Sequence, residues 1–143
     1  MRDITLKITG KQIYDTHEED QMEFVTEGQL YQKNGAVYVI YDESALSGLE
    51  GCKTTLKLDG DTLRMKRIGQ SGSGTEMYFE VNKRFCSTYS TPYGPMDLEI
   101  LTRSVENAFD METLSGNVAV CYDVSLQGVA EGKNKLEINV MQN

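Results

Sequence analysis

The chain has 143 residues, of which 39% are hydrophobic and 25% are charged, and its formal net charge at pH 7 is −8. This composition is typical of one globular domain, here residues 1–143, that is long enough to bury its own core. The acidic balance disfavours nucleic acid and anionic membrane surfaces as partners. No apolar run approaches the roughly 18 residues of a membrane-spanning helix, and the N-terminus has no apolar signal-peptide core, so we expect a cytoplasmic protein.

Three cysteines are present, and their pattern fits a reducing compartment. Cys52, Cys86 and Cys121 are odd in number, widely spaced and form no Cys-x-x-Cys pair. Free cysteine is among the most buried residue types, so we expect three small buried side chains. A catalytic thiol would need a histidine nearby, and the single histidine, His17, lies in an acidic segment.

Alternation of apolar and polar residues runs along the chain and predicts β-strands. The first strand begins near the N-terminus, where Ile4, Leu6 and Ile8 alternate with polar residues. The segment from Asp15 to Asp20 then reads as a polar turn. Its carboxylates lack the spacing of a known oxygen cage for a cation, so we predict a solvated turn and no metal site.

The most distinct hairpin turns at Asn34-Gly35, a pair that suits the type I′ turn because both central residues need positive φ. Pairing outward from this turn places Tyr31 opposite Tyr38 on the outer face, where they form an aromatic pair. Gly28 in the middle of the strand predicts a bulge, a bend or a close approach. The inward face of the hairpin then carries Phe24, Thr26, Gly28, Leu30, Val37, Val39 and Tyr41.

A second hairpin turns within Asp59-Gly60-Asp61, and either pair of adjacent residues can form the turn. Both alternatives put the same apolar residues inward: Leu56, Leu58, Leu63 and Met65. The opposite face carries a basic stripe, which consists of Lys53, Lys57, Arg64 and Lys66. This stripe is either a solvated face or a contact surface for an anionic ligand or an acidic partner.

The second half of the chain predicts further strands at about 76–81, 84–91, 96–104, 118–126 and 136–140. Pro92 and Pro95 enclose Tyr93 and predict a sharp corner at a barrel rim, with Tyr93 as a guard of the barrel mouth in the functional interpretation. Residues 104–115 allow either a helical turn or a continued strand, and residues 128–135 read as a turn.

About ten short strands joined mostly by hairpin-length turns predict an all-β protein. An antiparallel meander of this length must protect its edges, and closure into a barrel is the usual solution. We therefore predict a meander β-barrel of about 8–10 strands, which is filled by side chains or holds one small ligand.

The order and spacing of several motifs resemble the YwiB-like family over essentially the whole chain. These motifs are Gly28-x-Leu30, Asn34-Gly35, Thr91-Pro92-Tyr93-Gly94, Leu98-x-Ile100-x-Thr102 and the alternating run Gly116, Val118, Val120, Tyr122, Val124. The resemblance implies a bacterial protein with a calycin-type, lipocalin-like barrel, and it brings no established activity, cofactor or catalytic residue. The chain has no Trp and so lacks the Gly-x-Trp signature of lipocalins, which makes ligand carriage an analogy from the fold.

Hydroxyl groups at inward positions are the feature of the sequence that bears most on function. Among aliphatic residues, hydroxyls are what a small-ligand pocket uses to orient its ligand. Alternatively, each hydroxyl has a backbone or water partner. The candidate ligand-binding residues are Thr26, Tyr41, Tyr89, Tyr93, Thr102 and Tyr122, and Arg67 and Arg103 lie next to inward positions.

Two functions are favoured at this point, and a third, an enzyme on a calycin-type barrel, stays open only if a cavity gathers two or more titratable groups with perturbed pKa values. The first is the binding of a small, largely apolar molecule inside the barrel. The second is a barrel filled by its own side chains that acts from outside, as a partner-binding module or a homodimer, through Tyr31, Tyr38 and the basic stripe. No Ser-His pair, metal triad or cofactor motif can be placed, so we predict no catalytic residue, no metal and no cofactor.

Overall fold

The computed structural model describes residues 1–13, 19–43, 51–69, 74–91, 94–126 and 130–142. These residues contain no helix that is long and apolar enough to cross a membrane. They form ten strands: β1 (Arg2–Ile13), β2 (Glu19–Lys33), β3 (Ala36–Asp42), β4 (Lys53–Asp59), β5 (Thr62–Ile68), β6 (Gly74–Phe79), β7 (Arg84–Thr91), β8 (Gly94–Asp110), β9 (Ser115–Leu126) and β10 (Ala130–Gln142).

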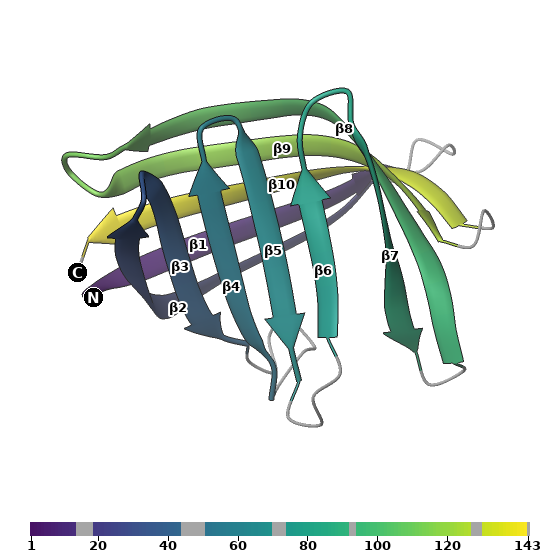
Figure 1. Ribbon diagram of the computed structural model, residues 1–143, viewed down its shortest axis with the longest axis horizontal. Coiled ribbons are helices and arrows are strands. Elements are labelled where there is room, and N and C mark those ends of the chain that lie inside the picture. Colours follow the sequence, from purple (N-terminus) through teal and green to yellow (C-terminus); the bar gives the residue numbers. More distant parts are fainter. Residues whose placement is uncertain (14–18, 44–50, 70–73, 92–93, 127–129, 143) are drawn as a thin grey trace.

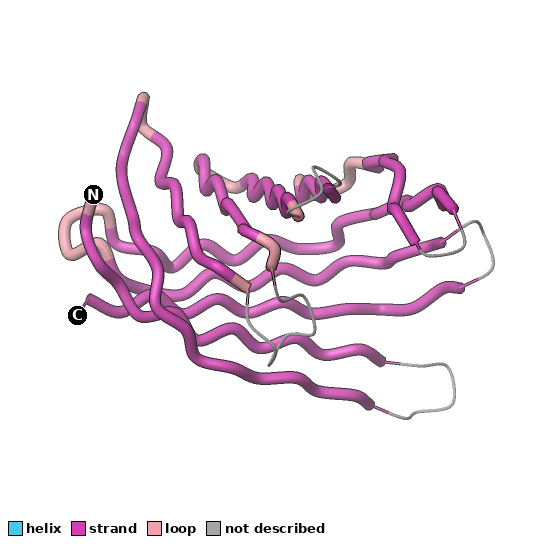
Figure 2. The backbone as a smooth tube through the Cα atoms, turned by 90° about the horizontal axis from the view of Figure 1, so that it is seen from below, coloured by secondary structure: helices cyan, strands magenta, loops and turns pink. Residues whose placement is uncertain are grey.

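All ten strands belong to one antiparallel sheet in the order β6-β5-β4-β3-β2-β1-β10-β9-β8-β7. The pairing of β1 with β10 joins the two ends of the chain inside this sheet. The sheet is strongly curved: β1, β9 and β10 run across the molecule, and β3 to β6 cross in front of them (Figure 1). Seen from below, the long strands form one layer and the remaining strands lie over it (Figure 2). The predicted antiparallel meander barrel is confirmed.

The barrel closes where its two edge strands, β6 and β7, meet. Here the contacts come from side chains: the Ser87 hydroxyl donates to the Glu76 carbonyl oxygen at 3.0 Å, and the rings of Tyr78 and Phe85 meet edge to face at 6.1 Å. An isolated bridge between Val81 and Thr102 adds a backbone contact beside this seam. The barrel is therefore nearly closed.

The inward side chains of all parts of the sheet meet in a single core. Leu56, Ile100, Val120 and Ile138 come from four strands and are all buried in it. Each buried side chain of this size stabilises the fold by about 1.5–3 kcal/mol relative to an exposed one. The alternation seen in the sequence therefore does predict which residues face inward.

Both predicted hairpins form. Asn34 and Gly35 adopt φ values of 54° and 81°, as a type I′ turn requires. Tyr31 lies opposite Tyr38, and their rings stack with centroids 4.8 Å apart. In the second hairpin Asp59 pairs with Thr62, so the two residues between them form the turn.

Residues 104–110 continue strand β8, which settles the alternative left open by the sequence. A β-bulge between Thr102 and Ser104 shifts the register of β8 against β9. Before the bulge the even-numbered residues of β8 face the core, and after it the odd-numbered residues do. Val105 and Phe109 accordingly pack against the core. Arg103, at the bulge, points outward and is exposed.

Two expectations are wrong. The cysteines are not buried: Cys86 is exposed, and Cys52 and Cys121 are half-buried. In β7 and β9 the reason is strand parity, since Cys86 and Cys121 alternate with the residues that face inward. The last strand begins at Ala130 rather than near 136, because paired backbone extends it through polar residues that carry no apolar pattern.

Candidate functional site

A group of polar side chains lies on the inward faces of three neighbouring strands. Tyr41 in β3 pairs with Thr54 in β4, and Thr54 pairs with Arg67 in β5. Glu43 directly follows β3 and lies beside Thr54. We call these four residues the polar cluster. Because adjacent strands are antiparallel, the end of β3, the start of β4 and the end of β5 lie at the same rim of the barrel.

Glu43 is the centre of the polar cluster. Its side chain has no exposed surface, and its Oε1 accepts a hydrogen bond from the Thr54 hydroxyl at 2.6 Å. The other oxygen, Oε2, is also buried and has no hydrogen-bond partner among the described residues. A buried carboxylate is costly unless it is paired and hydrogen-bonded, so this half-satisfied group is a site at which a further donor is favoured.

Arg67 carries the positive charge of the polar cluster, and its contacts to the other members are long. Its Nε lies 3.5 Å from Glu43 Oε1 and 3.4 Å from Thr54 Oγ1, and its Nη2 lies 3.6 Å from the sulfur of Met65. The two N···O distances exceed the range of about 2.7–3.2 Å that is usual for N–H···O hydrogen bonds. The side chain keeps 24% of its surface exposed, whereas Glu43 is closed off. Arg67 is therefore the member of the polar cluster that faces both the carboxylate and solvent.

Tyr41 and Tyr122, the two tyrosines of the site, stay protonated at neutral pH. Burial raises the pKa of Tyr41 far above its usual value, the negative charge of Glu43 and a hydrogen bond to its carboxylate raise it further, and Arg67 opposes the shift. Burial also raises the pKa of Tyr122 to about 12, against the opposing charge of Arg67. Each phenol can thus donate a hydrogen bond, and both respond to the guanidinium of Arg67.

Tyr122 and Thr102 lie opposite each other on β9 and β8. The Tyr122 ring packs against Phe79, with centroids 4.8 Å apart. Thr102 is fully buried, and its hydroxyl oxygen has no hydrogen-bond partner in the described part of the chain. This pair provides a second polar position among the apolar side chains of the interior.

Four of the six predicted ligand-binding residues can be placed. Tyr41 and Thr102 are buried, and Tyr122 is half-buried on the core. Thr26 is half-buried on the inward side of β2, where it pairs with Leu6 rather than with the polar cluster. The side chain of Tyr89 and the whole of Tyr93 lie outside the described residues, as do His17 and most of the acidic turn around it.

The sequence interpretation missed Glu43 and Thr54 and misplaced Arg67, although the alternation contains all three. Each residue occupies the next inward position after the apolar ones of its strand: Glu43 follows Val39 and Tyr41, Thr54 precedes Leu56 and Leu58, and Arg67 follows Leu63 and Met65. The signal was a charged or polar residue at the next inward position of each strand. The prediction that Arg67 merely adjoins inward positions is corrected: its side chain faces the interior and meets Glu43.

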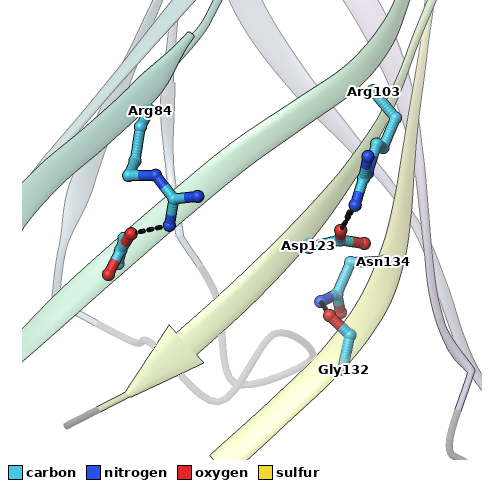
Figure 3. A network of polar contacts seen from close by, with 6 residues as sticks. Arg84, Arg103, Asp123, Gly132 and Asn134 are labelled. Carbon is cyan, nitrogen blue, oxygen red and sulfur yellow. Dashed lines mark hydrogen bonds and ion pairs between the residues drawn. The ribbon is translucent and has the colours of Figure 1, made fainter. Parts of the chain in front are cut away.

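The outer surface of β7 to β10 carries charges that are already paired. Arg84 forms an ion pair with Glu99, and Arg103 donates from Nε to Asp123 at 2.8 Å (Figure 3). Nearby, the Asn134 side-chain amide donates to the Gly132 carbonyl oxygen at 3.5 Å. A hollow of about 310 Å³ is lined by residues that include Arg84, Glu99 and Asp123. Because its one lining arginine, Arg84, already faces Glu99, this hollow offers a ligand less than the polar cluster does.

The described residues contain no group of three or more His, Cys, Asp or Glu side chains placed to hold a metal ion. The charge of the basic stripe on β4 and β5 is partly neutralised, since Lys53 lies 3.9 Å from Asp42 and Arg64 pairs with Glu76. The interior polar cluster is consequently the candidate site.

A family model described as "Domain of unknown function (DUF1934)" matches residues 6–138. The chain belongs to the DUF1934 family. A relative from Bacillus subtilis (strain 168), "Uncharacterized beta-barrel protein YwiB", is 28% identical over 142 residues, covering 94% of this chain and 90% of that protein. The crystal structure of the ywiB protein from Bacillus subtilis matches with a TM-score of 0.83 at 23% identity, over 99% of this chain and 92% of that one. The solved structure thus shows the same barrel fold, and the YwiB-like resemblance is confirmed.

Proposed function

We propose that this protein binds a small, largely apolar molecule inside its barrel and holds the polar group of that molecule with buried oxygen atoms. The supporting observation is that two buried oxygens, Glu43 Oε2 and Thr102 Oγ1, lack partners among the described residues. Leaving a buried acceptor unpaired costs about 1–3 kcal/mol, more for a charged group. A ligand that supplies the missing donors recovers this free energy on binding.

The surroundings of these oxygens suit such a ligand. Phe79 and Ile100 are fully buried, and Met65 lies directly against Arg67. Ligand pockets commonly combine apolar walls with a few convergent polar groups. The proposal assigns the ligand-binding role to Tyr41, Thr102 and Tyr122, and the same role for Thr26, Tyr89 and Tyr93 is likewise a prediction. A calycin-type, lipocalin-like relationship is part of this proposal, since such barrels can hold one small molecule.

Native mass spectrometry of freshly purified protein tests the proposal, because it reports bound molecules and stoichiometry together. We expect a one-to-one adduct of small mass, and a thermal-shift screen of hydrophobic metabolites should find a compound that raises the melting temperature. A bare chain in native spectra, combined with no stabiliser in a broad screen, would contradict the proposal.

A second candidate function is self-association through the outer face of β2 to β6. One cross-strand line there, the aromatic–cation row, consists of Tyr31, Tyr38, Lys57, Arg64 and Tyr78. Lys57 Nζ lies 5.7 Å from the Tyr38 ring centroid, and Arg64 Cζ lies 4.6 Å from that of Tyr78. Tyrosine and arginine carry much of the binding energy in protein interfaces.

Sedimentation equilibrium distinguishes this second function. A homodimer that dissociates on Tyr38→Ser, but not on substitution of an exposed residue elsewhere such as Glu106→Gln, supports it. A monomer at every concentration rejects it. A cytoplasmic location is a further part of the proposal, and it is supported by three free cysteines.

A further inference from the structure

The charge balance of the polar cluster restricts the head group that can enter it. Glu43 contributes one negative charge and Arg67 one positive charge, while Thr54 is neutral and Tyr41 stays protonated. A ligand carboxylate would place a second negative charge beside Glu43, and a ligand ammonium would place a second positive charge beside the guanidinium of Arg67. Either would be poorly compensated at a buried position, so an uncharged head group is favoured.

The hydrogen-bonding capacity of the polar cluster restricts the head group further. Glu43 Oε2 can only accept a hydrogen bond, and it has no donor among the described residues. The guanidinium of Arg67 can only donate, and its contacts to Glu43 and Thr54 are no shorter than 3.4 Å. A matching ligand must therefore present a donor and an acceptor on neighbouring atoms.

We propose that the interior site selects small apolar molecules with an amide-type head group, namely an amide, lactam or ureide. The N–H of such a group donates to Glu43 Oε2, and its carbonyl oxygen accepts from Arg67. This inference rests on the proposed function and adds the chemical class of the ligand. It also discriminates against fatty acids, whose carboxylate meets Glu43.

Three probes with the same alkyl chain separate the head group from the apolar body: octanamide, octanoate and octylammonium. Isothermal titration of the unaltered chain should give octanamide the lowest Kd, about tenfold below both others, because a hydrogen bond to a charged group is worth about 1.5–3 kcal/mol. If octanoate or octylammonium binds as tightly, the head-group inference is overturned while interior binding stands. If none of the three binds, both proposals are overturned.

A matched pair of variants locates the selectivity. Glu43→Gln removes the buried charge and leaves Arg67 uncompensated, so the preference should shift from octanamide to octanoate by about tenfold. Glu76→Gln makes the same chemical change in β6, where Glu76 pairs with Arg64, and should leave the ranking unchanged. An unchanged ranking in Glu43→Gln overturns the assignment to Glu43. If Glu43→Gln fails to fold, the ranking on the unaltered chain still decides the question.

Discussion

Arg67 Nε lies 3.5 Å from Glu43 Oε1, which links the end of β5 to the residue that follows β3. The carboxylate in this pair is closed off from solvent, whereas the guanidinium retains 24% exposure. Thr54, on the strand between them, donates to the same Oε1 at 2.6 Å. One oxygen of Glu43 thus receives both interactions and the other receives none among the described residues. Because Oε2 is left without a donor, a third group that donates a hydrogen bond can still bind to this ion pair.

Removing the cation should destabilise the protein. Arg67→Met keeps much of the side-chain volume but leaves the buried Glu43 carboxylate without its charge partner. Breaking a buried ion pair on one side costs about 3–5 kcal/mol, and the length of this contact places the expected loss near the lower limit. Urea unfolding of Arg67→Met measures it.

The double variant Arg67→Met with Glu43→Gln serves as the control for this prediction. Because both charges are absent, it should recover most of the stability that the single variant loses. If Arg67→Met unfolds at the same urea concentration as the unaltered chain, the ion pair makes no net contribution and the prediction is wrong.

Much of the fold could be predicted from the sequence because alternation repeats in nearly every strand. The pairing of Tyr31 with Tyr38 followed from the Asn34-Gly35 turn alone, since the turn sets the register of the whole hairpin. The course of residues 104–110 could not be derived, because the bulge at Arg103 changes the parity and no local residue pattern announces it.

The candidate site was predictable only in part. Tyr41, Thr102 and Tyr122 stood out as hydroxyls at inward positions. Glu43 did not, and Arg67 was placed only next to inward positions, because a charged residue at the end of an alternating run usually marks the end of the strand. Their contact reaches across β4, which lies between β3 and β5 in the sheet, and a single strand does not carry that information.

Tyr41 and Tyr122 should make the free energy of unfolding fall in alkali. Burial raises the folded-state pKa of Tyr122 to about 12 and that of Tyr41 well above its usual value of about 10, so the unfolded chain loses these protons first. Their contribution to the free energy of unfolding is complete below about pH 10 and is lost as the pH rises through the folded-state pKa. For Tyr122 this loss amounts to about 2–3 kcal/mol.

Urea unfolding between about pH 9 and pH 12 measures this loss, and tyrosinate absorbance follows the titration itself. Tyr122→Phe should flatten the decline in this window, since Phe has no proton to lose. A decline that is equally steep in Tyr122→Phe would show that Tyr122 titrates normally.

Thr102→Val tests the unpartnered hydroxyl in β8. Valine has nearly the same shape, and the Thr102 oxygen has no partner to lose among the described residues, so the unliganded protein should gain about 1 kcal/mol. If the hydroxyl binds ligand, the same variant should show a smaller rise in melting temperature with any stabiliser found by screening. Thr54→Val is the matched control. It deprives Glu43 of its shortest hydrogen bond and should cost about 2–3 kcal/mol, so equal effects of the two substitutions would contradict the assignment.

Gly28 is predicted to be required for the packing of β2 against β3 beside the polar cluster. A Cβ at this position would lie 2.7 Å from the Ile40 carbonyl oxygen and 3.2 Å from the Tyr41 Cβ. Gly28→Ala should therefore destabilise the protein by about 1–3 kcal/mol, as overpacking does, despite the smaller entropy of the unfolded chain.

Gly10→Ala in β1 is the control, because its Cβ would have no atom within 4 Å, and it should be neutral or stabilising by up to about 1 kcal/mol. Chemical denaturation of both variants measures the difference. If Gly28→Ala is as stable as Gly10→Ala, the strands have room to separate at this point and Tyr41 is not held by close packing.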